Sequence, residues 1–167
     1  MGYRAWAMRK GSNLLYPIFH NAKAWEIGNT QATCRAYVST VHQPAHAAPE
    51  ETCTCGLHAR TTLDGLLEEY PNYPHSNRGR FGGGKYISEY KTLILGSVLL
   101  WGEILRGEKV IRAEYGRPIC FTTLPARQRP YPEWDDLAAT VSQTYSTPII
   151  EWDYVELFSS EFGDLLT

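Results

Sequence analysis

The stretch from Cys34 to His58 constrains the fold of this chain most. It holds three of the four cysteines and three of the five histidines within 25 residues. In a reducing compartment, clustered cysteines bind metal more often than they form disulfides. We therefore expect this stretch to form a loop that folds around a metal ion.

Zinc suits the stretch best, because it favours four thiolate or imidazole ligands in a tetrahedron. Cys53 and Cys55 are one residue apart, so both sulfurs can reach one ion if the chain turns sharply, and Gly56 allows such a turn. The expected ligands are Cys34, His46, Cys53 and Cys55. Four such ligands leave no position for a reactive water, so we expect the zinc to be structural.

The fourth ligand has alternatives. His46 is preferred because Pro44 and Pro49 keep its segment out of regular secondary structure. His42 and His58 remain candidates for the same position. The competing interpretations are ordinary buried or free cysteines beside surface histidines, and a disulfide.

Length and composition favour one α+β domain over residues 1–167. A chain of this length supports one hydrophobic core, and an aromatic content of 13% favours strands. Apolar residues at helical spacing predict a helix beginning near residue 61 and another beginning near residue 132. The remaining five to seven strands suggest a mostly antiparallel sheet that closes towards a barrel.

The strands are predicted from short apolar or alternating segments bounded by turn residues. They are residues 3–8 and 14–19 as an N-terminal hairpin, 93–105 with a bulge at Gly102, 110–115, 118–124 after a break at Gly116, and 149–158. Cys120 lies on one of these apolar segments and is expected in the core. Residues 71–85, with two prolines and four glycines, are expected to form a flexible loop.

Charge is distributed unevenly along the chain. The formal net charge is −2, but all 16 Lys and Arg lie in residues 1–129, whereas residues 130–167 carry eight acidic residues and no basic one. The acidic C-terminal helix and strand therefore either pack beside the basic body or screen a site for an anion.

Two further groups are candidate binding sites. Arg78, Arg80 and Lys85 lie in a glycine-rich segment with aromatic residues, a mixture that contacts phosphates and stacks on bases. Tyr86 replaces the Ser or Thr of a phosphate-binding P-loop, so that motif is excluded. The alternative is a solvated loop.

The second group lies on the hairpin predicted from residues 93–115. Trp101, Glu103, Arg112 and Glu114 are predicted to form a charged cluster at the mouth of the sheet, able to hold a polar ligand. The alternative is a structural network of ion pairs or the solvent face of the sheet.

The N-terminal residues contain no apolar run long enough for a signal peptide, and the longest apolar run, residues 93–101, is too short to cross a bilayer. We therefore expect a cytoplasmic protein without a membrane partner.

Several motifs together resemble a group of uncharacterised proteins from actinobacteria and their phages. They are Cys34, His46-Ala-Ala-Pro49, Cys53-x-Cys55-Gly56-Leu57, Gly96-x-Val98-x-Leu100-Trp101-Gly102, Arg112-Ala113-Glu114 and the opening Gly2-Tyr3-Arg4-Ala5-Trp6. The resemblance covers most of residues 2–120, and His58 departs from it where an aromatic residue is expected. It implies the same metal ligands and a phage or actinobacterial source, but no activity.

Three functions follow from these patterns. The preferred one is a non-enzymatic, zinc-stabilised binding module that engages nucleic acid or a host protein. The alternatives are a structural or assembly subunit of a larger complex and a metal-dependent hydrolase or nuclease. No set of residues forming a nucleophilic triad is recognisable in the sequence.

Overall fold

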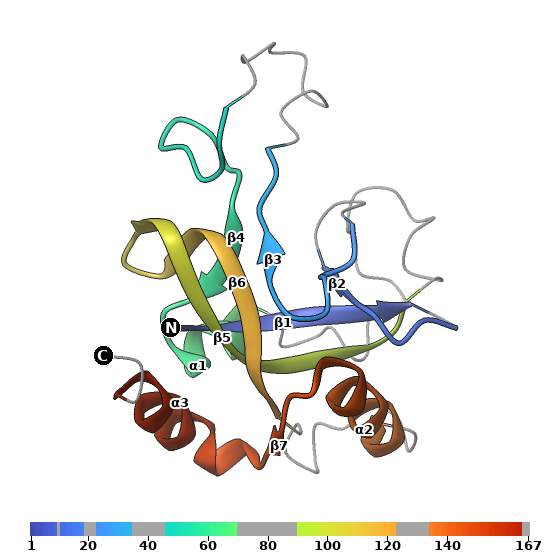
Figure 1. Cartoon of the computed structure of the whole chain (residues 1–167). Helices are drawn as coiled ribbons and strands as arrows, with labels where there is room; N and C mark the ends of the chain where they lie inside the picture. Colours follow the sequence, from blue (N-terminus) through green and yellow to red (C-terminus); the bar gives the residue numbers. More distant parts are fainter. Residues whose placement is uncertain (10, 19–22, 35–45, 70–89, 123–133, 165–167) are drawn as a thin grey trace.

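The computed structural model describes residues 1–9, 11–18, 23–34, 46–69, 90–122 and 134–164 (Figure 1). The strands are β1 (Gly2–Arg9), β2 (Leu15–Pro17), β3 (Thr30–Gln31), β4 (Leu57–Arg60), β5 (Tyr90–Arg106), β6 (Val110–Thr122) and β7 (Ile149–Ile150). The helices are α1 (Leu63–Glu69), α2 (Trp134–Tyr145), α3 (Val155–Asp164) and the short 3-10 helix η5 (Trp152–Tyr154). The predicted α+β class is confirmed.

Strand β6 organises the sheet. On one edge it pairs antiparallel with β5, from Thr122 opposite Leu95 to Ile111 opposite Arg106. Because β5 occupies that edge throughout, β4, β3 and β7 share the other edge of β6 in turn. The sheet is mostly antiparallel, as predicted, and among the described strands only β7 pairs in parallel.

Strand β1 closes a ring of strand pairings. It pairs with β5 along its length and with β4 at one position, where Tyr3 lies opposite Arg60. Since β4 and β5 both pair with β6, the four strands form a closed cycle. The side chain of Arg4 reinforces the sparse β1–β4 contact by donating a hydrogen bond to the carbonyl oxygen of His58.

Two predicted details of the strands are confirmed. Strand β2 returns beside β1, with Trp6 opposite Pro17, as the predicted N-terminal hairpin. The pairing of β5 with β6 shifts its register between Trp101 and Ile104, and Gly102 has a φ of 77° there. This is the predicted bulge.

The main hydrophobic core lies between the sheet and α2. Trp6 meets Trp25 and Phe121 edge to face, with ring centroids 5.4 Å and 5.8 Å away. From α2, Ala138, Val141 and Tyr145 complete this core at helical spacing. Trp25, which the sequence places in a loop, is therefore a central core residue, 2% exposed.

A second core lies on the other side of β1, because successive residues of a strand face opposite ways. It holds Ala5 of β1 with Leu63 and Leu66 of α1, Cys120 of β6 and Val155 of α3. The predicted helix α1 and the burial of Cys120 are thus confirmed.

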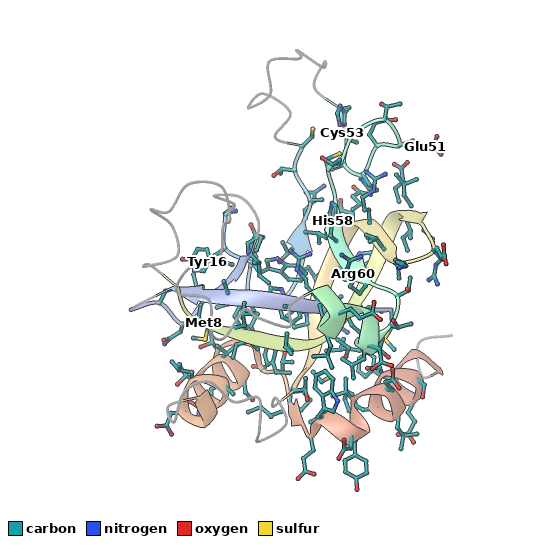
Figure 2. All side chains as sticks on the ribbon, turned by 180° about the vertical axis from the view of Figure 1, so that it is seen from behind. Met8, Tyr16, Glu51, Cys53, His58 and Arg60 are labelled. Atoms are coloured by element: carbon teal, nitrogen blue, oxygen red, sulfur yellow. The ribbon has the colours of Figure 1, made fainter. Side chains whose placement is uncertain are left out.

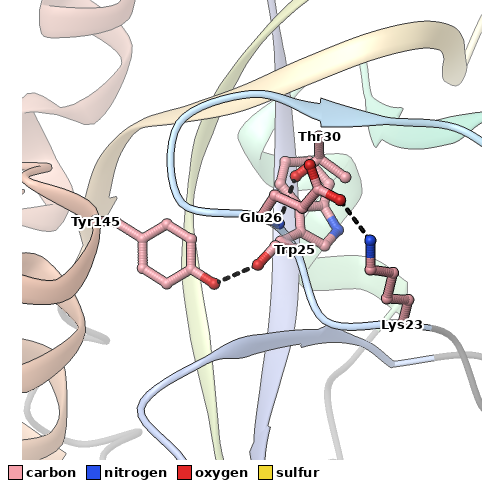
Figure 3. A network of polar contacts seen from close by, with 5 residues as sticks. All are labelled: Lys23, Trp25, Glu26, Thr30 and Tyr145. Atoms are coloured by element: carbon pink, nitrogen blue, oxygen red, sulfur yellow. Dashed lines mark hydrogen bonds and ion pairs between the residues drawn. The ribbon is translucent and has the colours of Figure 1, made fainter.

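The hydroxyl of Tyr145 joins three segments of the main core (Figure 3). It donates a hydrogen bond of 2.8 Å to the carbonyl oxygen of Trp25 and accepts one of 3.0 Å from the backbone N–H of Leu15. Burial raises the pKa of Tyr145, so the hydroxyl keeps the proton that it donates. A direct backbone bond from Trp25 to Leu15, 2.8 Å long, completes the network.

Two sequence predictions are wrong. Residues 149–158 were expected as a strand, but only Ile149–Ile150 pair, and η5 and α3 follow as a third α-helical region. Val155, Phe158 and Phe162 recur at helical spacing, which here outweighs the strand preference of aromatic residues. Gly116 does not break the strand at 110–115: β6 continues through it, because Gly116 pairs with Thr30 on one side and with Leu100 on the other.

We expect Tyr145→Phe to lower the free energy of unfolding by about 1–3 kcal/mol, because two buried backbone groups lose their hydrogen-bond partner. Urea denaturation followed by tryptophan fluorescence measures the change. Tyr154→Phe is the matched control: Tyr154 is 58% exposed, and its loss of a hydroxyl should cost less than about 0.5 kcal/mol. Equal effects of the two substitutions would contradict the role of the Tyr145 hydroxyl.

Candidate metal centre

The sheet brings together the two ends of the cysteine-rich loop. Cys34 follows β3 by three residues, and Cys55 precedes β4 by two residues. Both strands pair with the same edge of β6, so their ends lie close in space. In Figure 2, Cys53 and Glu51 lie at the end of the molecule opposite α2 and α3.

The four preferred ligand residues lie close together at this end of the molecule. The ligand atoms of Cys34, His46, Cys53 and Cys55 all lie within 4.8 Å of one another. Cys34 Sγ is 3.8 Å from Cys53 Sγ, and His46 Nε2 is 3.3 Å from Cys55 Sγ. A tetrahedral zinc with sulfur at about 2.3 Å separates neighbouring sulfurs by about 3.8 Å. The cluster can therefore hold a metal ion.

The three cysteines of the cluster are available as metal ligands. All four cysteines are free, and the three in the cluster are half-buried. Burial would raise the pKa of Cys53, but hydrogen bonds from the backbone and side chain of Cys55 and from the side chains of Cys34 and His46 lower it to about 7. Burial and the Cys53 side chain raise the pKa of Cys55 to about 11. Cys53 is therefore the first of this pair to become a thiolate.

The other candidate histidines are placed differently. His58 lies on β4 with an exposed side chain, and its Nε2 is 2.7 Å from the carbonyl oxygen of Thr54. It is not among the atoms of the cluster. His42 lies outside the described residues. His46 is thus the histidine that the structure brings to the three cysteines.

The side chain of Arg112 fixes the backbone of the loop that carries Cys53 and Cys55. Its Nη1 donates hydrogen bonds to the carbonyl oxygens of Glu50, at 3.0 Å, of Cys55, at 3.3 Å, and of Cys53. One guanidinium thus satisfies three backbone acceptors of a segment without regular structure.

Gly56 lets the loop approach β6 this closely. Its φ is +119°, and a Cβ at this position would lie 3.1 Å from Pro49 and 3.2 Å from Arg112. Any other residue would be strained by the backbone angle and would push the loop away from the strand. The sharp turn that Gly56 allows is therefore present in the structure.

The members of the second predicted cluster make separate contacts. They are Trp101, Glu103, Arg112 and Glu114. Arg112 contacts the loop, whereas Glu114 accepts bonds of 3.4 Å from Gln31 and from the backbone N–H of Glu103. Trp101 stacks on Tyr115, with ring centroids 5.8 Å apart. A shared ligand for these four residues remains a prediction. The contact of Arg112 with the loop has no signal in the sequence, because it depends on the pairing of β4 with β6.

The third group, Arg78, Arg80 and Lys85, lies outside the described residues together with the whole segment 71–85. Its binding role remains a prediction.

No protein-family model, curated protein or solved structure matches the chain. In the described part of the chain, no helix has the length and apolar character needed to cross a membrane.

We expect Arg112→Lys to weaken metal binding about 10–100-fold, as is typical when a partner that orients metal ligands is lost. The lysine side chain is one bond shorter than that of arginine, so its ammonium stops short of the carbonyl oxygens that Nη1 reaches. Competition with a chromophoric chelator measures the affinity. Arg117→Lys, on an exposed position of the same strand, is the control and should leave the affinity unchanged. Equal affinities of both variants would contradict the anchoring role.

Proposed function

We propose that this chain is a non-enzymatic binding module whose loop between β3 and β4 is held by structural zinc. The complete set of three thiols and one imidazole within 4.8 Å carries the proposal. Such soft ligands select zinc over hard cations such as magnesium. Among the described residues, this group contains no carboxylate, and its four ligands fill a tetrahedron, which leaves no position for a reactive water. A hydrolase or nuclease is correspondingly less favoured.

Zinc in this site would stabilise the weakest part of the sheet. Strand β3 pairs through only Thr30 and Gln31, with a further backbone bond of 2.7 Å from Ala32 to Glu114. Strand β4 has four paired residues and the anchor at Arg112 beside it. Through Cys34, the ion would tie β3 to the better-held β4.

We expect the purified protein to contain about one zinc per chain and to melt at a lower temperature after chelation, because structural zinc contributes folding energy. Elemental analysis and thermal melting with and without a chelator test this. Cys55→Ser should lose the metal. Cys120→Ser is the control: Cys120 lies in the second core, 2.9 Å from Ser97, and its loss should leave the zinc content unchanged. A metal-free protein that is indifferent to chelation would refute the proposal.

The partner that we propose first is nucleic acid, bound through Arg78, Arg80 and Lys85. The support is the composition of this segment, which combines basic, aromatic and glycine residues. The resemblance to phage proteins makes a host protein the alternative partner for the same module. Cytoplasmic location agrees with thiols that are free rather than paired in disulfides.

An assembly subunit is the second candidate, and one observation favours it. Tyr154, the last residue of η5, and Leu157, in the first turn of α3, are three residues apart and are 58% and 57% exposed. Asp153 and Glu156 lie beside them with exposed side chains. Adjacent exposed apolar residues with a polar rim are typical of a protein contact surface.

Two variants distinguish these roles. If the module binds nucleic acid, replacing Arg78, Arg80 and Lys85 by Ala should weaken binding to single-stranded DNA at least about tenfold and flatten its salt dependence, because phosphate contacts are lost. Leu157→Ser should leave that affinity unchanged. If the chain is an assembly subunit, Leu157→Ser should instead abolish association seen by light scattering. Fluorescence anisotropy and light scattering on both variants decide between them.

A further inference from the structure

We infer that Cys34 and Cys53 form an oxidation site: a disulfide between them displaces the metal and keeps β3 tied to β4. The inference rests on the proposed function for the release of zinc. The formation of the disulfide itself rests only on the positions of the four cysteines.

The positions of the sulfur atoms allow a bond between Cys34 and Cys53. Cys34 Sγ and Cys53 Sγ are 3.8 Å apart, so the sulfurs need to approach by about 2 Å to reach bonding distance. Cys55 Sγ is engaged by His46 Nε2 at 3.3 Å. Cys120 is fully buried on the far side of the sheet, in the second core. Cys53 also has a side-chain contact with Cys55, so the choice between Cys34 and Cys55 depends on the backbone that joins Cys53 to Cys55.

The hydrogen bonds from Arg112 to the loop disfavour a disulfide between Cys53 and Cys55. It would close a small ring across the single residue Thr54, which requires the backbone to fold more tightly. Arg112 donates hydrogen bonds to the carbonyl oxygens of both cysteines and so fixes this backbone. Cys34 lies beyond the end of a different strand, β3, so a bond from Cys53 to Cys34 closes no such small ring.

The reaction needs a two-electron oxidant, for which we name hydrogen peroxide. One thiolate attacks a peroxide oxygen, forming a sulfenic acid and releasing hydroxide. The second thiolate attacks the sulfenic sulfur, forms the S–S bond and releases a second hydroxide. Each hydroxide takes up a proton and leaves as water. Two of the four ligands are then in the disulfide, and the two that remain, His46 and Cys55, are too few to retain zinc in a closed tetrahedral site.

The disulfide replaces the metal as the link between two strand ends. Cys34 lies three residues beyond β3, and Cys53 lies on the loop that leads into β4. Oxidised, metal-free protein should therefore melt near the temperature of the zinc-loaded protein. Reduced protein stripped by a chelator has neither link and should melt at a lower temperature.

The test uses the full chain loaded with zinc and titrated with hydrogen peroxide. A colorimetric chelator records released zinc, and mass spectrometry of a non-reduced digest identifies the disulfide. We expect one zinc released for each Cys34–Cys53 bond, with both changes reversed by dithiothreitol. Cys120→Ser should behave like the unmodified protein, whereas Cys34→Ser should form no intramolecular disulfide. A Cys53–Cys55 bond, a disulfide between chains or sulfonic acids alone would overturn the inference.

Failure of the inference differs from failure of the proposed function. A protein that binds zinc but forms no Cys34–Cys53 bond would refute the oxidation site and leave the zinc module intact. A protein that binds no zinc would refute the module, and the same digest of peroxide-treated metal-free protein would still test the pair. Cys55→Ser, which should form the Cys34–Cys53 bond without bound metal, provides this second measurement.

Discussion

The structure depends on one edge of β6 that three short strands share. Strands β3 and β7 contribute only two paired residues each, and β4 contributes four. Backbone pairing over so few residues does not hold a chain segment in place by itself. Each short strand accordingly has a second attachment: Arg112 beside β4, the cysteine cluster beyond β3, and the helices that flank β7. The loop with the candidate metal centre follows from this arrangement.

Sequence reasoning succeeded where the signal is local or chemical. The alternation of β1 and the turn after it predict the first hairpin, and the clustering of Cys34, Cys53 and Cys55 predicts a shared site even though 18 residues separate the first two. It failed where tertiary contacts decide. The segment after Ile150 has residues suited to both strand and helix, and its helix forms because Val155 and Phe158 pack on the second core. The sequence places Arg112 in a charged cluster for a polar ligand, because nothing local shows which loop lies against it.

The two ends of the molecule differ in chemistry. At one end the cysteine cluster, with three thiolates and zinc, would carry a net charge of about −1 beside the positive Arg112. At the other end the η5–α3 segment presents acidic side chains and two exposed apolar residues. The sheet and its two cores lie between them (Figure 1). A partner bound at one end therefore leaves the other end accessible, which suits a module that connects two components.

The hydroxyl of Tyr145 also has a consequence for the order of folding. Its two hydrogen bonds reach residues 130 and 120 positions earlier in the chain, so neither can form until most of the chain is in place. The β5–β6 hairpin, in contrast, joins residues that are close in sequence. Contacts between distant residues are slow to form because the intervening chain must first be ordered. The hydrogen bonds of this hydroxyl therefore form late in folding. They affect the rate of unfolding rather than the rate of folding.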